Sequence, residues 1–333
     1  MGTFGRIFSV VFVICSQAVA AFADGGAGAD DSLHFVNVIR AYDVMKPAYR
    51  PFSGSGLWVR PCCWRGDAEL KGGGYADGSG KGIAAGCCIT TAKVAFIPLA
   101  AAVDLYASHR SGGFERRNDV HTAIDGHASG IGGSISVRAI GLDVRTVAFY
   151  ERTKSEERGK AENNILSDVF NVGLYLSQKI LPLGPISVCP ELAVVATRMS
   201  AADGEFFKTV GNDVFKFKRM WSSSSMWRLS PGAHIAFNGP GRGGCRISGR
   251  WNFDLGHRPT VKDLVPDGGA DYREALEVTN SHPALKWPKS GYGELEMAFG
   301  FAFGKELFGE ASVATHSINR RGMCAMFTLG KGF

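Results

Sequence analysis

Beyond its first residues, the sequence lacks any run of the ~18 consecutive apolar residues that a membrane-spanning helix needs. It also lacks a strong charge of one sign, since 37 Lys and Arg residues against 31 Asp and Glu residues give a net charge of only +6, which does not by itself indicate nucleic-acid binding. The hydrophobic share of 45% and the charged share of 20% exclude a disordered chain. Glycine, in contrast, is abundant: 44 of 333 residues is about 13%, against a typical ~7%. Glycine scattered at this density, with no collagen period, predicts many turns and many short strands.

The motifs of common enzyme classes are incomplete in this chain. Segment 78–82 (GSGKG) is similar to a phosphate-binding loop, but Tyr75 stands at the first glycine position and Gly82 replaces the Ser or Thr that would hold magnesium. Segment 132–136 lacks the closing glycine of a nucleophile elbow. We therefore expect a protein that is not an enzyme and that uses no cofactor and no metal.

The first residues predict a secretory signal peptide. Arg6 supplies a positive charge, residues 7–15 (IFSVVFVIC) form a short apolar core, and residues 21–23 (AFA) offer a cleavage site. A membrane anchor is disfavoured, because the apolar run is short and is followed by small residues. We expect a signal peptide at 1–23 and an exported mature chain at 24–333, which is then either soluble or a membrane β-barrel.

Alternation of apolar and polar residues favours the barrel. From 245 to 256 the odd-numbered residues, Trp251 among them, are mostly apolar, whereas Arg250 and other polar residues lie on the opposite face. Segments 291–303 and 323–333 repeat the pattern. The predicted strands are 33–42, 84–95, 98–109, 131–140, 143–152, 167–178, 186–198, 228–238, 245–256, 291–303, 308–318 and 323–333.

The lengths of the connections point to the same architecture. Every second connection is short and the intervening ones are mostly long, which is typical of bacterial outer-membrane barrels, with their short periplasmic turns, long outer loops and even strand number. We therefore predict an all-β fold: a transmembrane antiparallel up-and-down β-barrel of about 12 strands, with 8 or 10 as alternatives. The terminal aromatic Phe333 is the expected barrel-assembly signal, so the barrel-assembly machinery and outer-membrane lipid are expected partners. The predicted extracellular loops are 43–83, 110–130, 153–165, 199–227 and 257–290.

Three segments carry a resemblance to a known family. They are 35–52 (FVNVIRAYDVMKPAYRPF), 140–152 (IGLDVRTVAFYER) and 168–188 (DVFNVGLYLSQKILPLGPISV), to which the C-terminal Gly-x-Phe can be added. In these segments the sequence resembles the major surface-antigen family of outer-membrane barrels from Anaplasma- and Ehrlichia-type intracellular bacteria. The resemblance implies a surface-exposed barrel, with porin activity in some members and host-cell contact in others.

The polar faces of the predicted strands would line the barrel interior. Five bases and six acids make this interior nearly neutral, so the ring of one sign that ion selectivity needs is missing. Arg246 and Arg250 lie on the strand before Glu294 and Glu296, so cross-strand ion pairs are expected. Such groups either create a field across an open pore or fill a narrow barrel, and the sequence leaves both interpretations open. The candidate pore-lining residues are Lys93, Asp104, Arg138, Glu191, Arg228, Arg246, Arg250, Asp254, Glu294, Glu296 and Glu310.

Seven of the eight cysteines lie in the predicted mature chain, and export permits disulfides. An odd number leaves at least one free thiol or a bond to another chain. Adjacent cysteines are a poor zinc pattern, because zinc ligands are usually separated by two to four residues. We favour a crosslink from Cys62 or Cys63, in the first predicted outer loop, to another thiol, with Cys87 and Cys88 as the other candidates.

The predicted loop 199–227 contains an alternation of basic and aromatic residues at 215–221 (FKFKRMW). Such a pattern can bind polyanions, but we favour a strand that extends above the membrane, and we expect no specific nucleic-acid partner. His109, His121 and His127 are interpreted as exposed loop histidines rather than as metal ligands.

Together these features predict an outer-membrane surface antigen with passive porin-type diffusion of small solutes. The alternative is a closed barrel that acts as an adhesin through its outer loops, with the host-cell surface or a disulfide-linked second copy as partner. An outer-membrane enzyme is the least favoured alternative.

Overall fold

The computed structural model describes residues 55–69, 75–91, 100–117, 123–139, 141–157, 160–183, 185–210, 213–238, 244–257, 261–264, 290–303 and 306–332. No helix among these residues is long and apolar enough to cross a membrane. The predicted signal peptide at 1–23, the predicted first strand at 33–42 and Phe333 lie outside the described residues.

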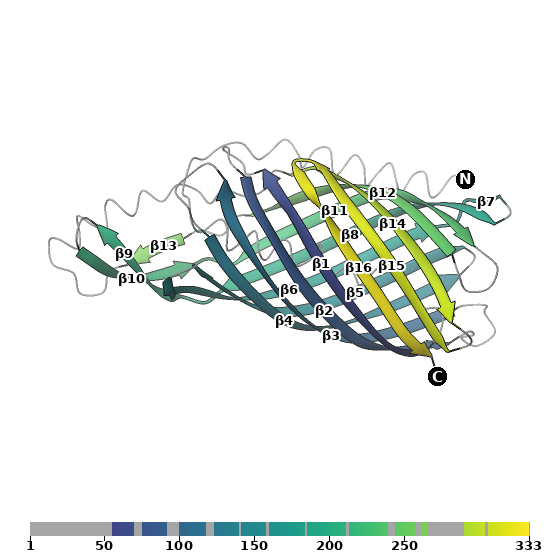
Figure 1. Cartoon of the computed structure of the whole chain (residues 1–333), viewed down its shortest axis with the longest axis horizontal. Helices are drawn as coiled ribbons and strands as arrows, with labels where there is room; N and C mark the ends of the chain where they lie inside the picture. The colour runs from purple at the N-terminus through teal and green to yellow at the C-terminus, as the bar shows by residue number, and fades with distance from the viewer. Residues whose placement is uncertain are drawn as a thin grey trace.

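Twelve long strands form a closed antiparallel barrel, which confirms the predicted fold class and strand number (Figure 1). Each strand pairs with the next barrel strand along the chain, and the last pairs with the first. The barrel strands are β1 (Gly56–Glu69), β2 (Tyr75–Thr91), β3 (Ala100–Arg117), β4 (Ala123–Ala139), β5 (Leu142–Glu157), β6 (Lys160–Gln178), β8 (Ile186–Ala201), β11 (Ser224–Asn238), β12 (Gly244–His257), β14 (Tyr292–Phe303), β15 (Leu307–Ile318) and β16 (Arg320–Gly332).

Four short strands lie outside this ring. β7 (Leu181–Leu183) pairs only with β8, in the connection from β6 to β8. β9 (Gly204–Val210), β10 (Asp213–Trp221) and β13 (Val261–Leu264) form a separate three-stranded sheet with β10 in the centre. This sheet projects beyond the barrel at the end opposite the C-terminus, which we name the projecting end (Figure 1). The opposite end, where β1 begins and β16 ends, is named the C-terminal end.

Three of the predicted outer loops are largely strand. The predicted loop 43–83 contains β1 and half of β2, while 110–130 and 153–165 contain the ends of β3, β4, β5 and β6. The strands were missed there because alternation of apolar and polar residues fades once the outer face leaves lipid, although the backbone ladder continues. Long connections at the projecting end are confined to 202–223 and 258–291, and these hold β9, β10 and β13.

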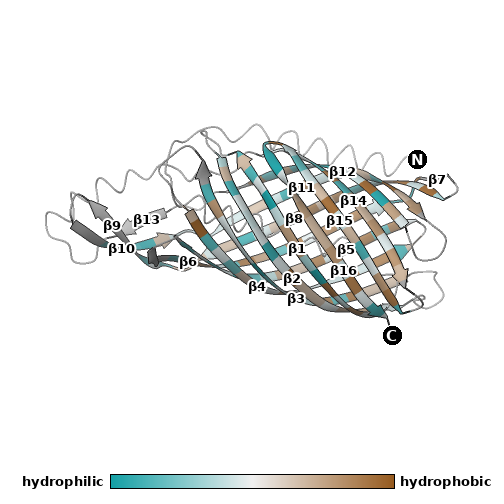
Figure 2. Ribbon diagram, in the orientation of Figure 1, coloured by the Kyte–Doolittle hydropathy of each residue, from teal (hydrophilic) through white to brown (hydrophobic). Residues whose placement is uncertain are grey.

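The outer surface carries an apolar belt. On β11 the outward side chains from Trp227 to Phe237 are apolar, and the next outward residue towards the projecting end is Ser225. Ten residues at ~3.3 Å each give about 33 Å along the strand, or about 25 Å of height at a tilt of ~40°. That height matches the ~25 Å apolar band of outer-membrane barrels. The alternation of hydrophilic and hydrophobic residues along the strands is visible as banding in Figure 2.

Aromatic rings packed on glycines fill the interior towards the projecting end. Trp64 stacks on Phe114 with ring centroids 5.1 Å apart, and Phe114 and Ile124 are fully buried. A Cβ atom on Gly80 would lie 2.6 Å from Trp64 Cζ2, and one on Gly112 would lie 2.8 Å from the same atom. Only glycine therefore leaves room for the indole at these two positions, and part of the glycine excess serves this packing.

Candidate functional site in the barrel interior

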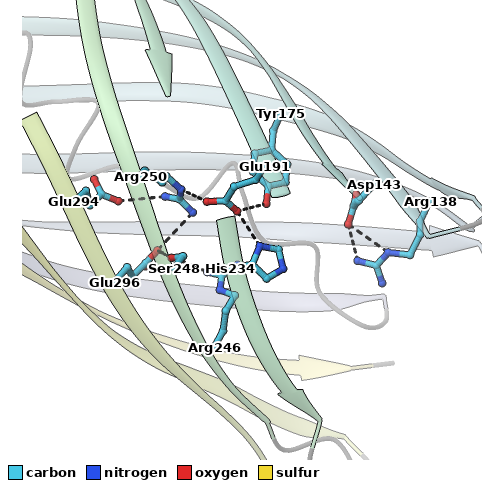
Figure 3. A network of polar contacts seen from close by, with 10 residues as sticks. All are labelled: Arg138, Asp143, Tyr175, Glu191, His234, Arg246, Ser248, Arg250, Glu294 and Glu296. Atoms are coloured by element: carbon cyan, nitrogen blue, oxygen red, sulfur yellow. Dashed lines mark hydrogen bonds and ion pairs between the residues drawn. The ribbon is translucent and has the colours of Figure 1, made fainter. Parts of the chain in front are cut away.

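Charged side chains gather on the inner face of the strands from β8 to β16. Because successive side chains of a strand point to opposite faces, Arg250, Asn252 and Asp254 on β12 point inwards and are buried, whereas Trp251 between them is exposed on the outer surface. The same alternation brings Glu294 on β14 to the inner face. These inward groups meet across strands and form ion-pair networks (Figure 3).

Arg250 lies at the centre of the largest network. It stands opposite Gly232 of β11 and Glu294 of β14 in the strand register. Arg250 Nε donates to Glu191 Oε1, its Nη1 donates to Glu294 Oε1 at 3.2 Å, and its Nη2 lies 3.7 Å from Glu296 Oε2. A Cβ atom on Gly232 would lie 2.8 Å from Arg250 Cγ, so this glycine makes room for the side chain. One guanidinium thus joins carboxylates from β8 and β14 (Figure 3).

The second carboxylate oxygen of Glu191 is contacted by polar side chains from two other strands. Tyr175 of β6 donates its hydroxyl to Glu191 Oε2 at 2.8 Å, and His234 Nδ1 of β11 lies 2.9 Å from the same oxygen. Glu191 is only 2% exposed, so its charge is held entirely by protein groups. The carboxylate therefore links β6, β8, β11 and β12 around the inner wall.

The edge of the same network reaches β15. Arg246 Nη2 lies 3.7 Å from Glu296 Oε2, and His316 Nε2 lies 3.4 Å from Glu294 Oε2. Three carboxylates are therefore met by two arginines and two histidines within 4 Å. A cluster with both signs present neutralises itself and offers no ring of one charge.

A second cluster is built on Asp254. Arg228 donates to both of its oxygens at 2.6 and 3.1 Å, and Arg320 Nη2 donates to Oδ2 at 2.6 Å. The ring of Tyr292 lies 5.6 Å from Arg228 Cζ and 4.1 Å from Arg320 Cζ, so it faces both cations. All three charged side chains are about 2% exposed.

A third pair crosses the other half of the barrel. Arg110 on β3 donates to both oxygens of Glu151 on β5, at 2.8 and 3.1 Å, although β4 lies between the two strands. The side chains are 3% and 0% exposed, so water does not reach them. A bidentate pair that reaches over an intervening strand occupies the interior rather than lining an open channel.

Some interior groups near the C-terminal end are partly open to water. The side chains of Arg246 and His234, which lie nearer the C-terminal end than Arg250 does, are 18% and 13% exposed. The interior is therefore reachable from that end, but access stops at the layer of Arg250 and Glu191.

The sequence-predicted interior residues, apart from Arg138, fall into three groups in the structure. Arg246 and Glu310 are half-buried, and the expected pairs of Arg246 and Arg250 with Glu294 and Glu296 are present. Lys93 lies outside the described residues. The predicted residues that are buried and inward-facing are Asp104, Glu191, Arg228, Arg250, Asp254, Glu294 and Glu296.

Arg138 does not belong to the interior. Its side chain is 60% exposed and pairs with Asp143 at 2.7 Å, across the turn between β4 and β5. Figure 3 shows this pair apart from the Arg250 network. Because β4 ends at Ala139, Arg138 reaches the rim of the C-terminal end instead of the lumen.

Several interior groups were not found from the sequence. Arg60 lies on a strand that was read as loop, and Arg110 lies just past the predicted end of its strand. Arg145 and Glu151 do lie within a predicted strand, and their alternation with Val144 and other outward residues was the signal that could have assigned them.

No disulfide joins the four candidate cysteines to one another in this structure. Cys62, Cys63, Cys87 and Cys88 carry free thiols, and they lie on paired strands rather than in an outer loop. Cys62 stands opposite Gly82, six residues along β2 from Cys88, which is about 20 Å. Cys63 and Cys87 face outward with a similar separation, so register keeps the two pairs apart.

The basic and aromatic segment 215–221 forms most of β10, so the interpretation as a strand is confirmed. It belongs to the separate sheet and does not prolong a barrel strand. His109 and His127 are exposed on the outer faces of β3 and β4 rather than in a loop, and His121 lies outside the described residues. Among the residues that the structure describes, no group of three or more His, Cys, Asp or Glu side chains could hold a metal ion.

Comparison with solved structures places the fold among outer-membrane barrels. The transport unit of the autotransporter AIDA-I from Escherichia coli matches with a TM-score of 0.62 and 11% identity, over 92% of this chain and 99% of that one. The translocator domain of the autotransporter NalP from Neisseria meningitidis matches with a TM-score of 0.65 and 12% identity, over 91% and 97%. No family model matches the sequence, and no curated protein sequence is significantly similar to it. The chain thus has the fold of a bacterial outer-membrane barrel of twelve strands.

Proposed function

We propose that this protein is an outer-membrane barrel with a filled interior that acts at the cell surface through its projecting end. The observation that carries this proposal is the burial of the paired interior charges. Arg228, Glu191 and Glu151 are exposed by 2%, 2% and 0%. A water-filled channel beside them would leave such long side chains substantially exposed, because they would border solvent.

The side chains that occupy the interior differ between the two halves of the barrel, apolar in one and charged in the other, and both sets support a closed barrel. Towards the projecting end, Phe114 and Ile124 are fully buried among aromatic rings. Deeper in the barrel, the Arg250 network and the Asp254 cluster tie neighbouring strands together. Solutes would have to displace apolar packing and buried ion pairs to pass.

The projecting end offers a surface for a partner. β3, β4, β5 and β6 continue past the apolar belt, where their outward residues become charged, as Arg152 and Lys154 on β5 illustrate. The sheet of β9, β10 and β13 adds the exposed bases Lys216 and Lys218. With long connections facing outward, as in outer-membrane barrels, this end would meet a host-cell surface. That role agrees with the resemblance to the Anaplasma- and Ehrlichia-type surface antigens, which remains part of the proposal. We assign the protein no enzymatic activity and no cofactor.

Planar-bilayer recording of the refolded protein, combined with cell binding, tests the proposal. We expect no steady conductance steps above the empty bilayer, and saturable binding to cells. In a variant in which a short Gly-Ser turn replaces residues 204–221, binding should fall while the heat-modifiable gel mobility of the folded barrel is retained. Ohmic conductance steps that scale with salt, or binding that is unchanged in this variant, would contradict the proposal.

Passive diffusion is the second candidate, and the opening at the C-terminal end favours it. Arg246 and His234 are partly reached by water from that end. If small solutes pass, replacement of Arg246 by Ala should enlarge the opening and raise the conductance. The two solved structures are named as transport parts of autotransporters; a filled interior makes transport of a polypeptide through this barrel a poorer proposal.

A further inference from the structure

Three basic side chains stand together on the outer wall of β16, β1 and β2. They are Arg321, Arg65 and Lys81, and all three are exposed. In the register, Lys81 is opposite Cys63 and Arg321 is opposite Asp67, so each is a diagonal neighbour of Arg65. Diagonal neighbours in antiparallel strands are about 7–8 Å apart at Cα, within reach of long side chains.

The tilt of the strands puts these three residues at nearly one height. The paired residues can be traced from strand to strand once around the barrel, from β2 through β3 and onwards back to β2. A trace that starts at Thr90 of β2 returns to β2 at Ala76, 14 residues (90 minus 76) nearer the projecting end. Positions at equal height therefore step back by about one residue per strand towards the C-terminal end. Arg65 and Lys81 each lie two residues back from the position opposite the previous cation, about one residue more than this step. The strip therefore runs close to the membrane plane and inclines towards the C-terminal end from Arg321 to Lys81.

The strip lies on the upper border of the apolar belt. The next outward residues towards the C-terminal end are Met323 on β16, Cys63 on β1 and Ile83 on β2, and Met323 and Ile83 are 58% and 48% exposed. Towards the projecting end the next outward residues are Asp67 on β1 and Ser79 on β2, and Asp77 is one outward position beyond Ser79. The cations therefore stand where lipid acyl chains end and headgroups begin.

No described side chain neutralises the strip. Asp67 is directly opposite Arg321, but its Oδ1 is buried without a hydrogen-bond partner, and no ion pair joins the two. On the projecting part of β5, in contrast, the outward bases are paired: Arg152 lies 3.5 Å from Asp168, and Lys154 lies 2.9 Å from Glu156. Neighbouring like charges destabilise a sheet, so an external anion would stabilise this one.

We propose that the strip of Arg321, Arg65 and Lys81 is a binding site for the phosphate of an anionic membrane lipid. The acyl chains would lie on the apolar wall of β16, β1 and β2, and the phosphate would be held by the two guanidinium groups and the ammonium group. Arginine suits this role because its planar fork donates two hydrogen bonds to phosphate oxygens. A lipid supplies both parts of the match, whereas a free phosphate ion would use only the cations.

Native mass spectrometry of the refolded barrel in mixed micelles of phosphatidylglycerol and phosphatidylcholine tests the site. A variant with Arg65→Gln, Lys81→Gln and Arg321→Gln should lose phosphatidylglycerol binding about 100-fold, since each basic side chain near an anionic surface contributes roughly five-fold. The exposed positions tolerate glutamine, and a variant with Arg65→Lys and Arg321→Lys, which keeps the charge, should retain most of the binding.

The matched control removes three exposed bases from the outer surface of other strands, β5 and β8: Arg152→Gln, Lys154→Gln and Arg198→Gln. This control should keep phosphatidylglycerol binding within two-fold of the unmodified protein. Equal losses in both triple variants would overturn the proposal in favour of non-specific charge attraction. Unchanged binding in the first variant would also overturn it, as would displacement of the lipid by millimolar inorganic phosphate, which would mark a site for the free ion.

Discussion

Removal of the Arg250 guanidinium tests whether the interior charges are a neutralised filling. In the native barrel, Glu191, Glu294 and Glu296 are met by Arg250 and Arg246 within 4 Å. Arg250→Met leaves three buried carboxylates with one arginine. Loss of one partner of a buried ion pair costs about 3–5 kcal/mol, because an uncompensated charge remains away from water.

The control is Glu294→Gln on the partner strand. It leaves Glu191 and Glu296 with both arginines, and the amide oxygen can still accept a hydrogen bond from Arg250, so we expect a loss of only about 1 kcal/mol. The double variant Arg250→Met with Glu294→Gln should be more stable than Arg250→Met alone, because it removes one of the uncompensated carboxylates. Residues in contact commonly couple by 0.5–3 kcal/mol.

Urea unfolding of the refolded barrel in detergent measures these differences, with tryptophan fluorescence and the gel mobility of the folded band as two probes. The reasoning is refuted if Arg250→Met destabilises no more than Glu294→Gln. It is also refuted if the double variant loses the sum of the two single losses, since that would mean that Arg250 and Glu294 act independently.

The same unfolding assay checks the lipid face and the ring packing, and mass spectrometry checks the cysteine assignment. Leu295→Arg, in the apolar belt, should destabilise the barrel by about 2–4 kcal/mol in a bilayer, whereas Ser79→Arg, above the belt, should cost about 0–1 kcal/mol; equal effects would count against the position of the belt. Gly80→Ala should cost about 1–3 kcal/mol because its Cβ meets an indole ring and a carbonyl oxygen at 2.6 Å, while Gly249→Ala, with no atom within 4 Å, should be near neutral. Mass spectrometry of a non-reduced digest should find no peptide pair that links the cysteines of β1 to those of β2, and a linked pair would disprove the register.

How far the fold could be predicted depended on what each strand borders. β12 and β14 cross lipid on one side and charged groups on the other, so their polarity alternates and their bounds were found within a few residues. β1 has Trp58 and Trp64 inside and Leu57 outside, so both of its faces are apolar and no alternation marks it. The strand was therefore placed too early in the chain, although the total of twelve strands was correct.

The candidate site was predictable only where charges repeat on neighbouring strands. Bases repeat on β12 and acids repeat on β14, so an ion pair is expected even if the predicted register is slightly wrong, and the pair of Arg250 and Glu294 is present. The third contact of that arginine, with Glu191, depends on β11 offering Gly232 between the strands, which no local pattern reveals. Whether the interior is open or filled could not be derived from charge counts, because it depends on side chains meeting across the lumen.

The strand walls above the apolar belt also bear on how this surface can evolve. A loop accepts insertions and deletions, but one inserted residue in a paired strand turns every following side chain to the opposite face. Among relatives of this protein, changes in the projecting parts of β3, β4 and β5 should therefore be substitutions at every second position. Length variation should collect instead in the two connections 202–223 and 258–291. A lineage under pressure to alter its exposed surface would then vary in two separate ways in one molecule: by substitutions on the projecting strands and by changes in the length of the two connections.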